Sequence, residues 1–364
     1  MQGAHDWAEN LDKAFDGHGY YKSYADPQIP SRVINDEFTL TSTWTDDILG
    51  ASSTIEGEQM AKDQLAKTYE IKDMGETTLI LGMHIKRNDN GDVTLLQESY
   101  GHHLLERFNM SHCTPVSTPL PPGTSLSVED CPTTPQEVDE MKSVPYREAL
   151  GSLMWLQVAT HPDLSYTVNI LSRFAHNPGR THWNAMKHTL AYVKSTLNYG
   201  ITYKGGEPLN PVGYVDSDYA GCKGTRCSTE GNIFVVVGGP VSWQSKRQEI
   251  VALSTVKSEY MAFTRATSQV LWIIKFFAEI GLPIPTPITI YADNNGFISN
   301  STTNKHHCHT KHIDIKFHFV NEHTKKREVI FNYIPSANNI ADLFTKPLPW
   351  DTVRRLAATL DLIL

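Results

Sequence analysis

The sequence predicts an α/β (α+β) protein in which a mixed sheet is flanked by helices. Runs in which polar and apolar residues alternate, such as residues 212–217, are typical of strands. Runs with apolar residues at spacings of three and four, such as residues 255–280, are typical of helices. From residue 209 onward three strand-like runs come first, and helical and strand-like runs then alternate. This order indicates a mixed sheet with helices on its faces.

The length and composition of the chain allow several domains and leave the partner undecided. A chain of 364 residues, of which 40% are hydrophobic, is long enough for two or three domains with cores of their own. No apolar run reaches about 18 residues, so we expect no membrane-spanning helix and no membrane partner. Five cysteines at irregular spacing indicate reduced thiols in an intracellular protein. The net charge of −8 neither identifies nor excludes a nucleic-acid partner.

Residues 1–110 are predicted to form a small α/β unit. A short helix within residues 1–30 is followed by a strand over 38–44 and a helix over 56–69. Two further strands, over 78–85 and 93–97, are joined by a turn with Asn-Gly chemistry.

Two adjacent aspartates, Asp46 and Asp47, stand at the tight turn that follows the strand over 38–44. Adjacent carboxylates at the tip of a hairpin can hold Mg²⁺. An ordinary turn, in which an aspartate side chain bonds the nearby backbone, explains the same residues equally well. These residues alone leave both interpretations open.

Residues 111–208 are predicted to be a strap followed by a helical spacer. The segment 111–145 is rich in Pro, Ser and Thr, which is typical of a linker or an extended strap. Helical spacing resumes at Pro145, with a break at His161-Pro162 and a further helix for which Thr181 is the expected N-cap. The histidines of this region, at positions 176, 182 and 188, are expected at the surface rather than in a metal site.

The block from Leu209 onward contains the predicted mixed sheet. Its expected strands cover 212–217, 231–237, 241–245, 288–292 and 328–333, and its expected helices cover 255–280, 294–300, 312–324 and 338–346.

Four acidic residues stand at informative places in this block. Asp216 lies near the end of its first strand, and Glu259 begins the apolar stripe of the long helix. Asp293 follows a strand directly, at the end where ligands bind in α/β sheets, and Asp342 opens the last helix. Like charges brought together repel, so such a set is understandable if divalent cations lie between its members. We therefore predict a site that holds two Mg²⁺ or Mn²⁺ ions and cleaves a phosphodiester, with Asp216 bridging the two ions.

Each acidic residue also has a structural explanation. Glu259 could belong to a capping box with Thr255 or Ser258, and Asp293 could cap the following helix. Asp342 in a first helical turn is favoured by the helix dipole. Asp218 shares a strand face with Asp216 and is its rival, but we prefer Asp216 because it lies deeper in the strand.

Six motifs in residues 209–349 resemble the ribonuclease H domain of copia-type LTR-retrotransposon Pol polyproteins. They are YVDSDYAG (214–221), RCSTEGNIF (226–234), VSWQSKRQEIVALSTVKSEYMA (241–262), YADNNG (291–296), TKHIDIKFHFV (310–320) and NIADLFTKPL (339–348). The resemblance implies a ribonuclease H-like fold and hydrolysis of the RNA strand of an RNA–DNA hybrid. By position it assigns metal binding and catalysis to Asp216, Glu259, Asp293 and Asp342.

The resemblance also bears on basic residues and on two departures. Lys246, Arg247, Lys311 and His312 are expected to contact the nucleic acid. The run 306–312 is crowded with His and Cys, but its ligands are too closely spaced for a standard zinc site. The loop 334–338 lacks the histidine that cellular ribonucleases H use as a proton shuttle, so the chain must manage without it.

Residues 1–110 resemble the later part of the reverse transcriptase palm of the same polyproteins. The motifs are TWTDDILG (43–50), YEIKDMG (69–75) and LGMHI (81–85), and TPLPPG (118–123) leads to the thumb and connection. Asp46 and Asp47 match the aspartate pair of the polymerase. In such enzymes the fingers and the first catalytic aspartate lie upstream of residue 1. We therefore expect a vestigial pair and no DNA synthesis by this chain alone.

The resemblance divides the chain into four ranges. They are a partial palm (1–110), a strap with a helical thumb or connection (111–208), a ribonuclease H-like domain (209–349) and a C-terminal helical tail (350–364). The expected partner is an RNA–DNA hybrid, with other Pol or Gag products of the element as further candidates. The expected location is inside the cell, and the resemblance is compatible with the cytoplasm, a virus-like particle and the nucleus.

The sequence allows two alternatives to an active ribonuclease H. One is a catalytically decayed retroelement remnant that only binds nucleic acid or a partner. The other, an integrase-like DNA-cutting enzyme, is disfavoured because such enzymes normally use three acids and lack the motif NIADLFTKPL.

Overall fold

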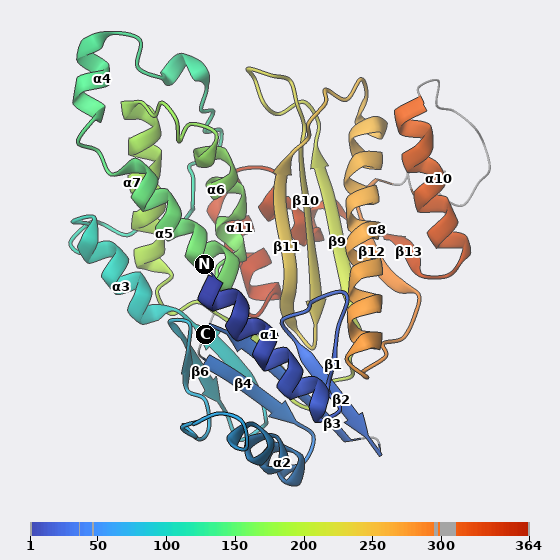
Figure 1. Cartoon of the computed structure of the whole chain (residues 1–364). Helices are drawn as coiled ribbons and strands as arrows, with labels where there is room; N and C mark the ends of the chain where they lie inside the picture. The colour runs from blue at the N-terminus through green and yellow to red at the C-terminus, as the bar shows by residue number, and fades with distance from the viewer. Residues whose placement is uncertain (1, 36, 46, 295–297, 299–310, 363–364) are drawn as a thin grey trace. The chain divides into compact units, whose positions relative to one another are not determined.

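The chain folds into two compact units with a mixed α/β architecture, as the sequence predicts (Figure 1). One unit comprises residues 1–77 and 268–285, and the other comprises 78–267 and 286–364. Among the described helices none is both long enough and apolar enough to cross a membrane. The computed structural model describes residues 2–35, 37–45, 47–294, 298 and 311–362, without the side chains of 2–6, 8 and 311–314.

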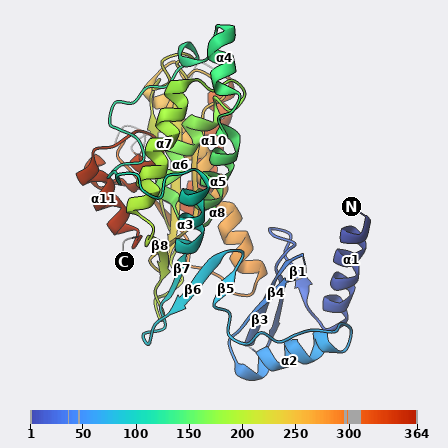
Figure 2. The same cartoon turned by 90° about the vertical axis from the view of Figure 1, so that its left-hand side faces the viewer.

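The first unit contains a four-stranded antiparallel sheet with two helices of residues 1–77 beside it (Figure 2), together with residues 268–279 of a long helix that begins in the second unit. Leu11 and Phe15 of α1 pack with Ala61 and Leu65 of α2 in its core, and Thr54 caps α2 by accepting the N–H of Gly57 at 3.1 Å. The elements in chain order are α1 (Gln2–Gly17), β1 (Tyr21–Lys22), β2 (Pro30–Ile34), β3 (Glu37–Trp44), β4 (Asp47–Ser52) and α2 (Ile55–Ala66).

The second unit begins with a hairpin where a single strand over 78–85 was predicted. That prediction is wrong: β5 (Leu79–Ile80) turns back into β6 (Met83–Arg87) at Leu81 and Gly82. Both turn residues have positive φ, 50° and 73°, which suits the twist of a two-residue hairpin. This turn could not be predicted from the residue types, because leucine rarely adopts a positive φ.

The strands β7 (Val93–Leu96) and β8 (Gly200–Tyr203) complete this sheet in the order β5-β6-β7-β8. Leu95 of β7 lies opposite Ile201 of β8, which joins segments far apart in the chain. The compact units therefore do not follow the four predicted ranges, which stay a prediction.

A helical layer follows, built on a core that includes Leu153, Leu156, Leu164 and Met186. Its helices are α3 (Glu98–Arg107), α4 (Pro135–Met141), α5 (Tyr146–Ala159), α6 (Ser165–Ser172) and α7 (Arg180–Ser195), with short 3-10 helices η1 (Val128–Asp130) and η2 (Pro162–Leu164).

Two local predictions in this layer need correction. The helix α4 lies inside the predicted linker, where Thr134 and Glu137 form a capping box around the first turn. The helix α7 begins at Arg180 with Gly179 rather than Thr181 as its N-cap.

The histidines of the helical layer are not all at the surface. His176 is exposed as predicted, but His182 is fully buried. Its Nδ1 accepts the N–H of Gly179 at 2.9 Å, and its ring stacks on Phe174 with 3.9 Å between ring centres. Burial lowers the pKa of His182, which keeps this ring neutral. His188 is half-buried and donates to the carbonyl of Thr118 at 2.9 Å.

The predicted mixed sheet is present in the order β11-β10-β9-β12-β13 (Figure 1). β9 (Val212–Asp218), β10 (Thr229–Val236) and β11 (Gly239–Arg247) are antiparallel, whereas β12 (Ile288–Ala292) and β13 (Val329–Tyr333) run parallel to β9. The long helix α8 (Thr255–Glu279) packs Phe263 against Phe331 of β13, with 4.9 Å between ring centres. The helix α10 (Lys311–Lys325) lies between β12 and β13 in the chain. The short helix predicted over 294–300 lies largely outside the described residues.

The end of the chain returns to the sheet in tight turns. A helix was predicted over 338–346, but the structure has the 3-10 segments η3 (Ser336–Asn338) and η4 (Ile340–Phe344) there. Asn339 fixes η4, because its side chain accepts the N–H of Ala341 at 3.1 Å and donates to the carbonyl of Val215 at 3.0 Å. This contact places the start of η4 against β9. The helix α11 (Trp350–Thr359) follows.

Candidate active site

Asp216 is buried near the carboxyl end of β9, with 6% of its surface exposed. Its Oδ2 accepts a hydrogen bond from the Thr345 hydroxyl at 2.5 Å. Asp218, its rival, is only half-buried, and its carboxyl group lies against Gly221 so closely that a side chain there would collide with it. Burial and the charge of Asp216 raise the pKa of Asp218. Asp216 is therefore the deeper of the two carboxylates, as the strand pattern suggested.

Glu259 lies in the first turns of α8 and is 8% exposed. Burial raises its pKa well above the usual range, and the negative charges of Asp216 and Asp293 raise it further. The hydroxyl that caps α8 belongs to Ser254, which accepts the N–H of Lys257 at 3.3 Å. A capping box with Thr255 or Ser258 therefore does not explain Glu259. The groups that act on its carboxyl are Asp216 and Asp293, together with a hydrogen bond from Asn294 and the charge of Lys346.

Asp293 and Asp342 come from two further elements. Tyr291 of β12 lies opposite Tyr214 of β9 in a parallel register, so Asp293 leaves β12 at the same edge of the sheet as Asp216. Asp342 lies on η4 and is 6% exposed. Burial, together with the nearby charge of Asp216, raises the pKa of Asp342 to about 7.

Lys346 is the basic residue that accompanies these acids. Its Nζ lies 2.8 Å from Oδ1 of Asp342 and 4.0 Å from Oδ2 of Asp216. Burial disfavours the charge of Lys346, but the carboxylates of Asp216 and Asp342 more than offset this and raise its pKa. The ammonium group thus occupies a position in which a bound cation would be stabilised.

The acids fit divalent cations, provided that Lys346 moves. No three acidic, histidine or cysteine side chains among the described residues are grouped closely enough to hold an ion as they stand. Yet the raised pKa values show that Asp216 acts on both Glu259 and Asp342. Both findings are understandable if Lys346, which pairs with Asp216 and Asp342, takes the place of a cation between them. A donor set made only of carboxylate oxygens suits Mg²⁺ or Mn²⁺.

A buried polar network holds α8 against the sheet beside this site. Ser258, the neighbour of Glu259, forms hydrogen bonds with Ser217 of β9 and with Gln248. The Gln248 amide donates to the Ser258 carbonyl at 2.8 Å and to Glu230 of β10 at 3.2 Å. Arg265 of α8 pairs with the same glutamate, which is 2% exposed. The network fixes the turn that carries Glu259.

Sequence reasoning missed Lys346, Thr345 and this network. Lys346 and Thr345 lie within the motif NIADLFTKPL, and Glu230, Gln248 and Ser258 lie within other motifs of the resemblance. The motifs therefore contained the signal, but spacing alone gave these residues no role.

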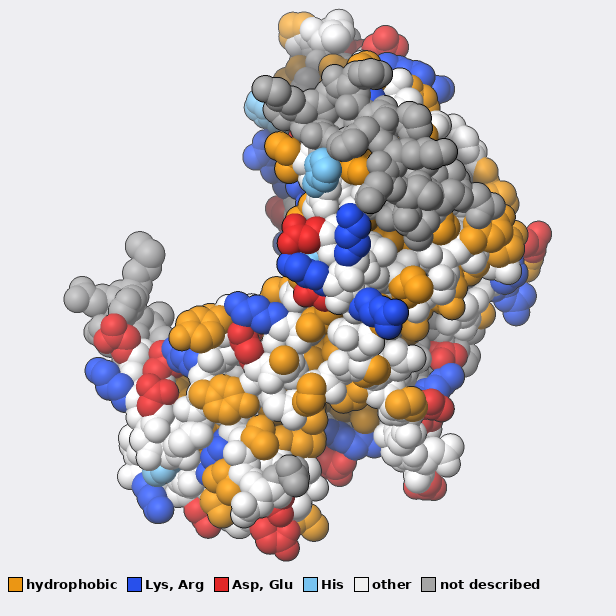
Figure 3. All heavy atoms as spheres, turned by 90° about the vertical axis from the view of Figure 1, so that its right-hand side faces the viewer, with side chains coloured by type: hydrophobic (Ala, Val, Ile, Leu, Met, Phe, Trp, Pro, Cys, Tyr) orange, Lys and Arg blue, Asp and Glu red, His pale blue; other side chains and the backbone are white. Residues whose placement is uncertain are grey.

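The remaining predicted residues are placed only in part. Lys246 is half-buried and pairs with Glu249 at 3.5 Å, while Arg247 is exposed on the same strand. Basic and acidic side chains are interspersed on the face shown in Figure 3. The side chains of Lys311 and His312 lie outside the described residues, as does the run 306–310. Asp47 is exposed at the start of β4, and Asp46 also lies outside the described residues.

Comparison with known proteins gives the class and then the family. Residues 1–122 match the family described as reverse transcriptase (RNA-dependent DNA polymerase). The chain is 37% identical over 350 residues to the retrovirus-related Pol polyprotein from transposon TNT 1-94 of Nicotiana tabacum. This alignment covers 96% of this chain and 26% of that protein. It is 35% identical over 231 residues to an uncharacterized mitochondrial protein of Arabidopsis thaliana. This alignment covers 63% of this chain and 92% of that protein.

These findings define a protein of reverse-transcribing elements. The chain belongs to the retrovirus-related Pol polyproteins of copia-type transposons. It spans about a quarter of the length of the TNT 1-94 polyprotein.

Two solved structures are similar at a distance. The foamy viral protease-reverse transcriptase in complex with RNA/DNA hybrid has 12% identity and a TM-score of 0.44, over 81% of this chain and 36% of that one. LC11-RNase H1 in complex with RNA/DNA hybrid has 15% identity and a TM-score of 0.29, over 37% of this chain and 94% of that one. Both similarities are too weak to bear on function.

Proposed function

We propose that the second unit is a ribonuclease H that hydrolyses the RNA strand of RNA–DNA hybrids with two divalent cations. One observation carries the proposal: the charge of buried Asp216 on β9 raises the pKa of buried Glu259 on α8 and of buried Asp342 on η4, at one edge of the mixed sheet. Burying like charges together is costly, and a structural role does not explain the cost. The family supports the proposal, because its polyproteins belong to reverse-transcribing elements.

Asp216, Glu259, Asp293 and Asp342 would hold the cations. When bound, two such ions supply activation of a water and neutralisation of the charge on the leaving 3′ oxygen. Asp216 would be the central member of this set, since its charge raises the pKa of both Glu259 and Asp342. The Thr345 hydroxyl orients its Oδ2, and the network through Ser258 fixes the turn that carries Glu259.

Three groups of the chain must change state before catalysis. Glu259 and Asp342, whose pKa values are both raised, must release their protons, and Lys346 must give up its pairs with Asp342 and Asp216. No histidine stands in residues 334–338 to carry a proton from the product, so the proton passes to solvent in this scheme. Lys246, Arg247, Lys311 and His312 are the proposed contacts to the hybrid, mainly through its backbone and 2′-hydroxyl groups.

The alternative is a remnant that binds nucleic acid without cleaving it. Lys346 favours this alternative, because it neutralises part of the acidic cluster without a metal. One assay separates the two: Mg²⁺- or Mn²⁺-dependent cleavage of a labelled RNA–DNA hybrid, with single-stranded RNA and duplex DNA as controls. The proposal predicts cleavage of the hybrid alone and its loss in Asp293→Asn. Hybrid that stays intact, or cleavage that Asp293→Asn leaves unchanged, refutes it.

For the first unit we propose a vestigial polymerase segment. The family match covers residues 1–122, and Asp46-Asp47 corresponds to the polymerase aspartate pair. Asp47 is exposed at the start of β4, unlike the buried acids of the second unit. Primer extension on an RNA template by this chain would contradict the proposal.

A further inference from the structure

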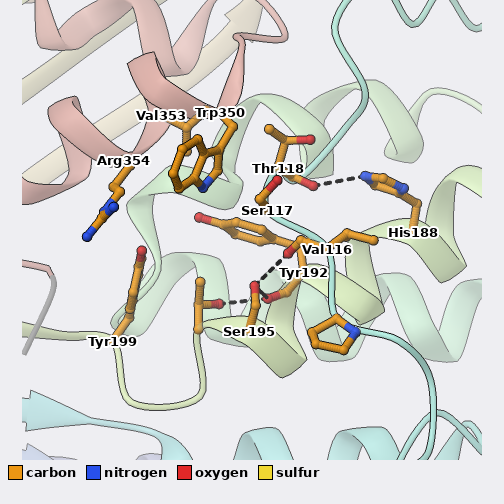
Figure 4. Close-up of a pocket in the computed structure, with 12 residues that line it drawn as sticks. Val116, Ser117, Thr118, His188, Tyr192, Ser195, Tyr199, Trp350, Val353 and Arg354 are labelled. Carbon is orange, nitrogen blue, oxygen red and sulfur yellow. Dashed lines mark hydrogen bonds between the residues drawn. The ribbon is translucent and has the colours of Figure 1, made fainter.

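The second unit has a cavity of about 590 Å³ that contains none of the four acids. It is bounded by the strap 115–118, the C-terminal half of α7, Tyr199 and the start of α11 (Figure 4). Cavities of this size hold small-molecule ligands. No part of the proposed function uses it.

One wall of the cavity is held in place before any ligand arrives. The hydroxyl of Ser195 donates to the carbonyl of Val116 at 2.6 Å, and His188 donates to that of Thr118 at 2.9 Å. The N–H of Val116 donates to the carbonyl of Ala191 at 3.3 Å. The strap is thus fixed along α7 by bonds from both backbone and side chains. A preformed wall lowers the entropy lost on binding.

The lining combines aromatic rings with one guanidinium. Trp350 is 45% exposed, and Arg354 lies over its ring at 5.5 Å from the ring centre. The hydroxyl of buried Tyr192 donates to Asp163 at 2.6 Å, so this hydroxyl is already paired before a ligand binds. None of the described residues that line the cavity is acidic, and burial lowers the pKa of His188, which keeps it neutral. Arg354 therefore gives the cavity a positive charge.

We propose that this cavity binds a nucleotide unit, with its base against the ring of Trp350 and its phosphate on Arg354. Bases stack on aromatic side chains regardless of sequence, and the planar guanidinium matches the oxygens of a phosphate. Exposed Ser117 of the strap also lines the cavity, and its hydroxyl can bind the polar edge of a base. The choice of a nucleotide over other anionic aromatic ligands rests on the proposed function. The presence of the cavity and its positive charge do not depend on the proposed function.

The test is calorimetric titration of the whole chain with 5′-AMP, with adenosine and with a short single-stranded DNA. EDTA is present throughout, so that neither metal binding nor cleavage contributes. Two substitutions in the cavity, Arg354→Gln and Trp350→Leu, are compared with Arg355→Gln and Trp44→Leu. Arg355 is exposed beside Arg354, and Trp44 is exposed in the other unit. Circular dichroism and thermal unfolding verify that each variant is folded.

The proposal predicts that 5′-AMP binds and that Arg354→Gln weakens this binding about tenfold or more, as expected for loss of a charged hydrogen bond. Trp350→Leu weakens binding of every probe, and the two control variants change it less than about twofold. Tighter binding of the strand than of 5′-AMP identifies a nucleic-acid strand as the source of the nucleotide, and the reverse identifies a free nucleotide.

Three results overturn the proposal: no binding of any probe, equal affinity of adenosine and 5′-AMP, or equal effects of Arg354→Gln and Arg355→Gln. Hybrid cleavage is measured separately with Mg²⁺. A chain that binds nucleotide but does not cleave hybrid refutes only the proposed function. A chain that cleaves hybrid but does not bind nucleotide refutes only the proposal for the cavity.

Discussion

Replacing Asp342 by asparagine should stabilise the protein above neutral pH. The pKa of this carboxyl group is about 7 in the folded chain, against 3.8 without its surroundings. Below pH 3.8 both states carry the proton, and the group costs nothing. Between these values the folded chain keeps a proton that the unfolded chain has lost, so stability falls as pH rises. About three pKa units, at about 1.36 kcal/mol each, make a cost of about 4 kcal/mol above pH 7.

Asparagine keeps the shape of the side chain and removes this charge. It also removes the ion-pair partner of Lys346, so we expect a net gain of about 1 to 4 kcal/mol at pH 8. The gain shrinks toward zero near pH 4. Urea unfolding followed by circular dichroism at pH 4 and pH 8 measures it, with the exposed Asp351→Asn as the matched control.

The same unfolding experiment is repeated with Mg²⁺ added. The ion neutralises the acids in the native chain, so adding it should stabilise the natural protein and narrow its difference from Asp342→Asn. A variant that is less stable than the natural protein at pH 8 would refute the reasoning. It would show that the pair with Lys346 outweighs the repulsion among the acids.

Three further predictions concern activity and packing. Glu259→Gln abolishes hybrid cleavage, whereas Asp218→Asn keeps most of it. If both variants lost cleavage equally, Asp218 would also be a metal ligand. Gln248→Ala leaves buried partners unpaired and lowers the free energy of unfolding by about 1–3 kcal/mol, which chemical denaturation checks. Gly231→Ala places a methyl group 2.6 Å from an η4 side chain and costs about 1–3 kcal/mol, whereas Gly224→Ala, in open space, changes stability little. Equal effects of the two glycine substitutions would contradict this packing.

Periodicity predicted the parts of the fold that depend on burial. The apolar stripe behind Glu259 is buried at Phe263, Ala266 and Val270, because a helix that covers a sheet needs such a stripe. The place of Asp293 at the end of a strand followed from the same reasoning, since parallel neighbours end at one edge of a sheet. These patterns predict that the candidate acids lie in one region of the sheet.

The features that the sequence did not predict depend on particular tertiary contacts. The burial of His182 results from Phe174 and the backbone of Gly179, which no periodicity reveals. The position of Lys346 depends on η4 being a 3-10 turn rather than the predicted helix. The helix α4, by contrast, could have been predicted from the sequence. Thr134 and Glu137 form a capping-box pair, but the prolines around them indicated only a linker.

The most direct test sets the two acidic sites of the chain against each other. Cleavage of a labelled RNA–DNA hybrid in Mg²⁺ is measured for the natural chain, for Asp216→Asn and for Asp47→Asn. If the second unit contains the working site, Asp216→Asn abolishes cleavage and Asp47→Asn leaves it unchanged. Cleavage that survives Asp216→Asn, or that is lost in Asp47→Asn, would contradict the assignment.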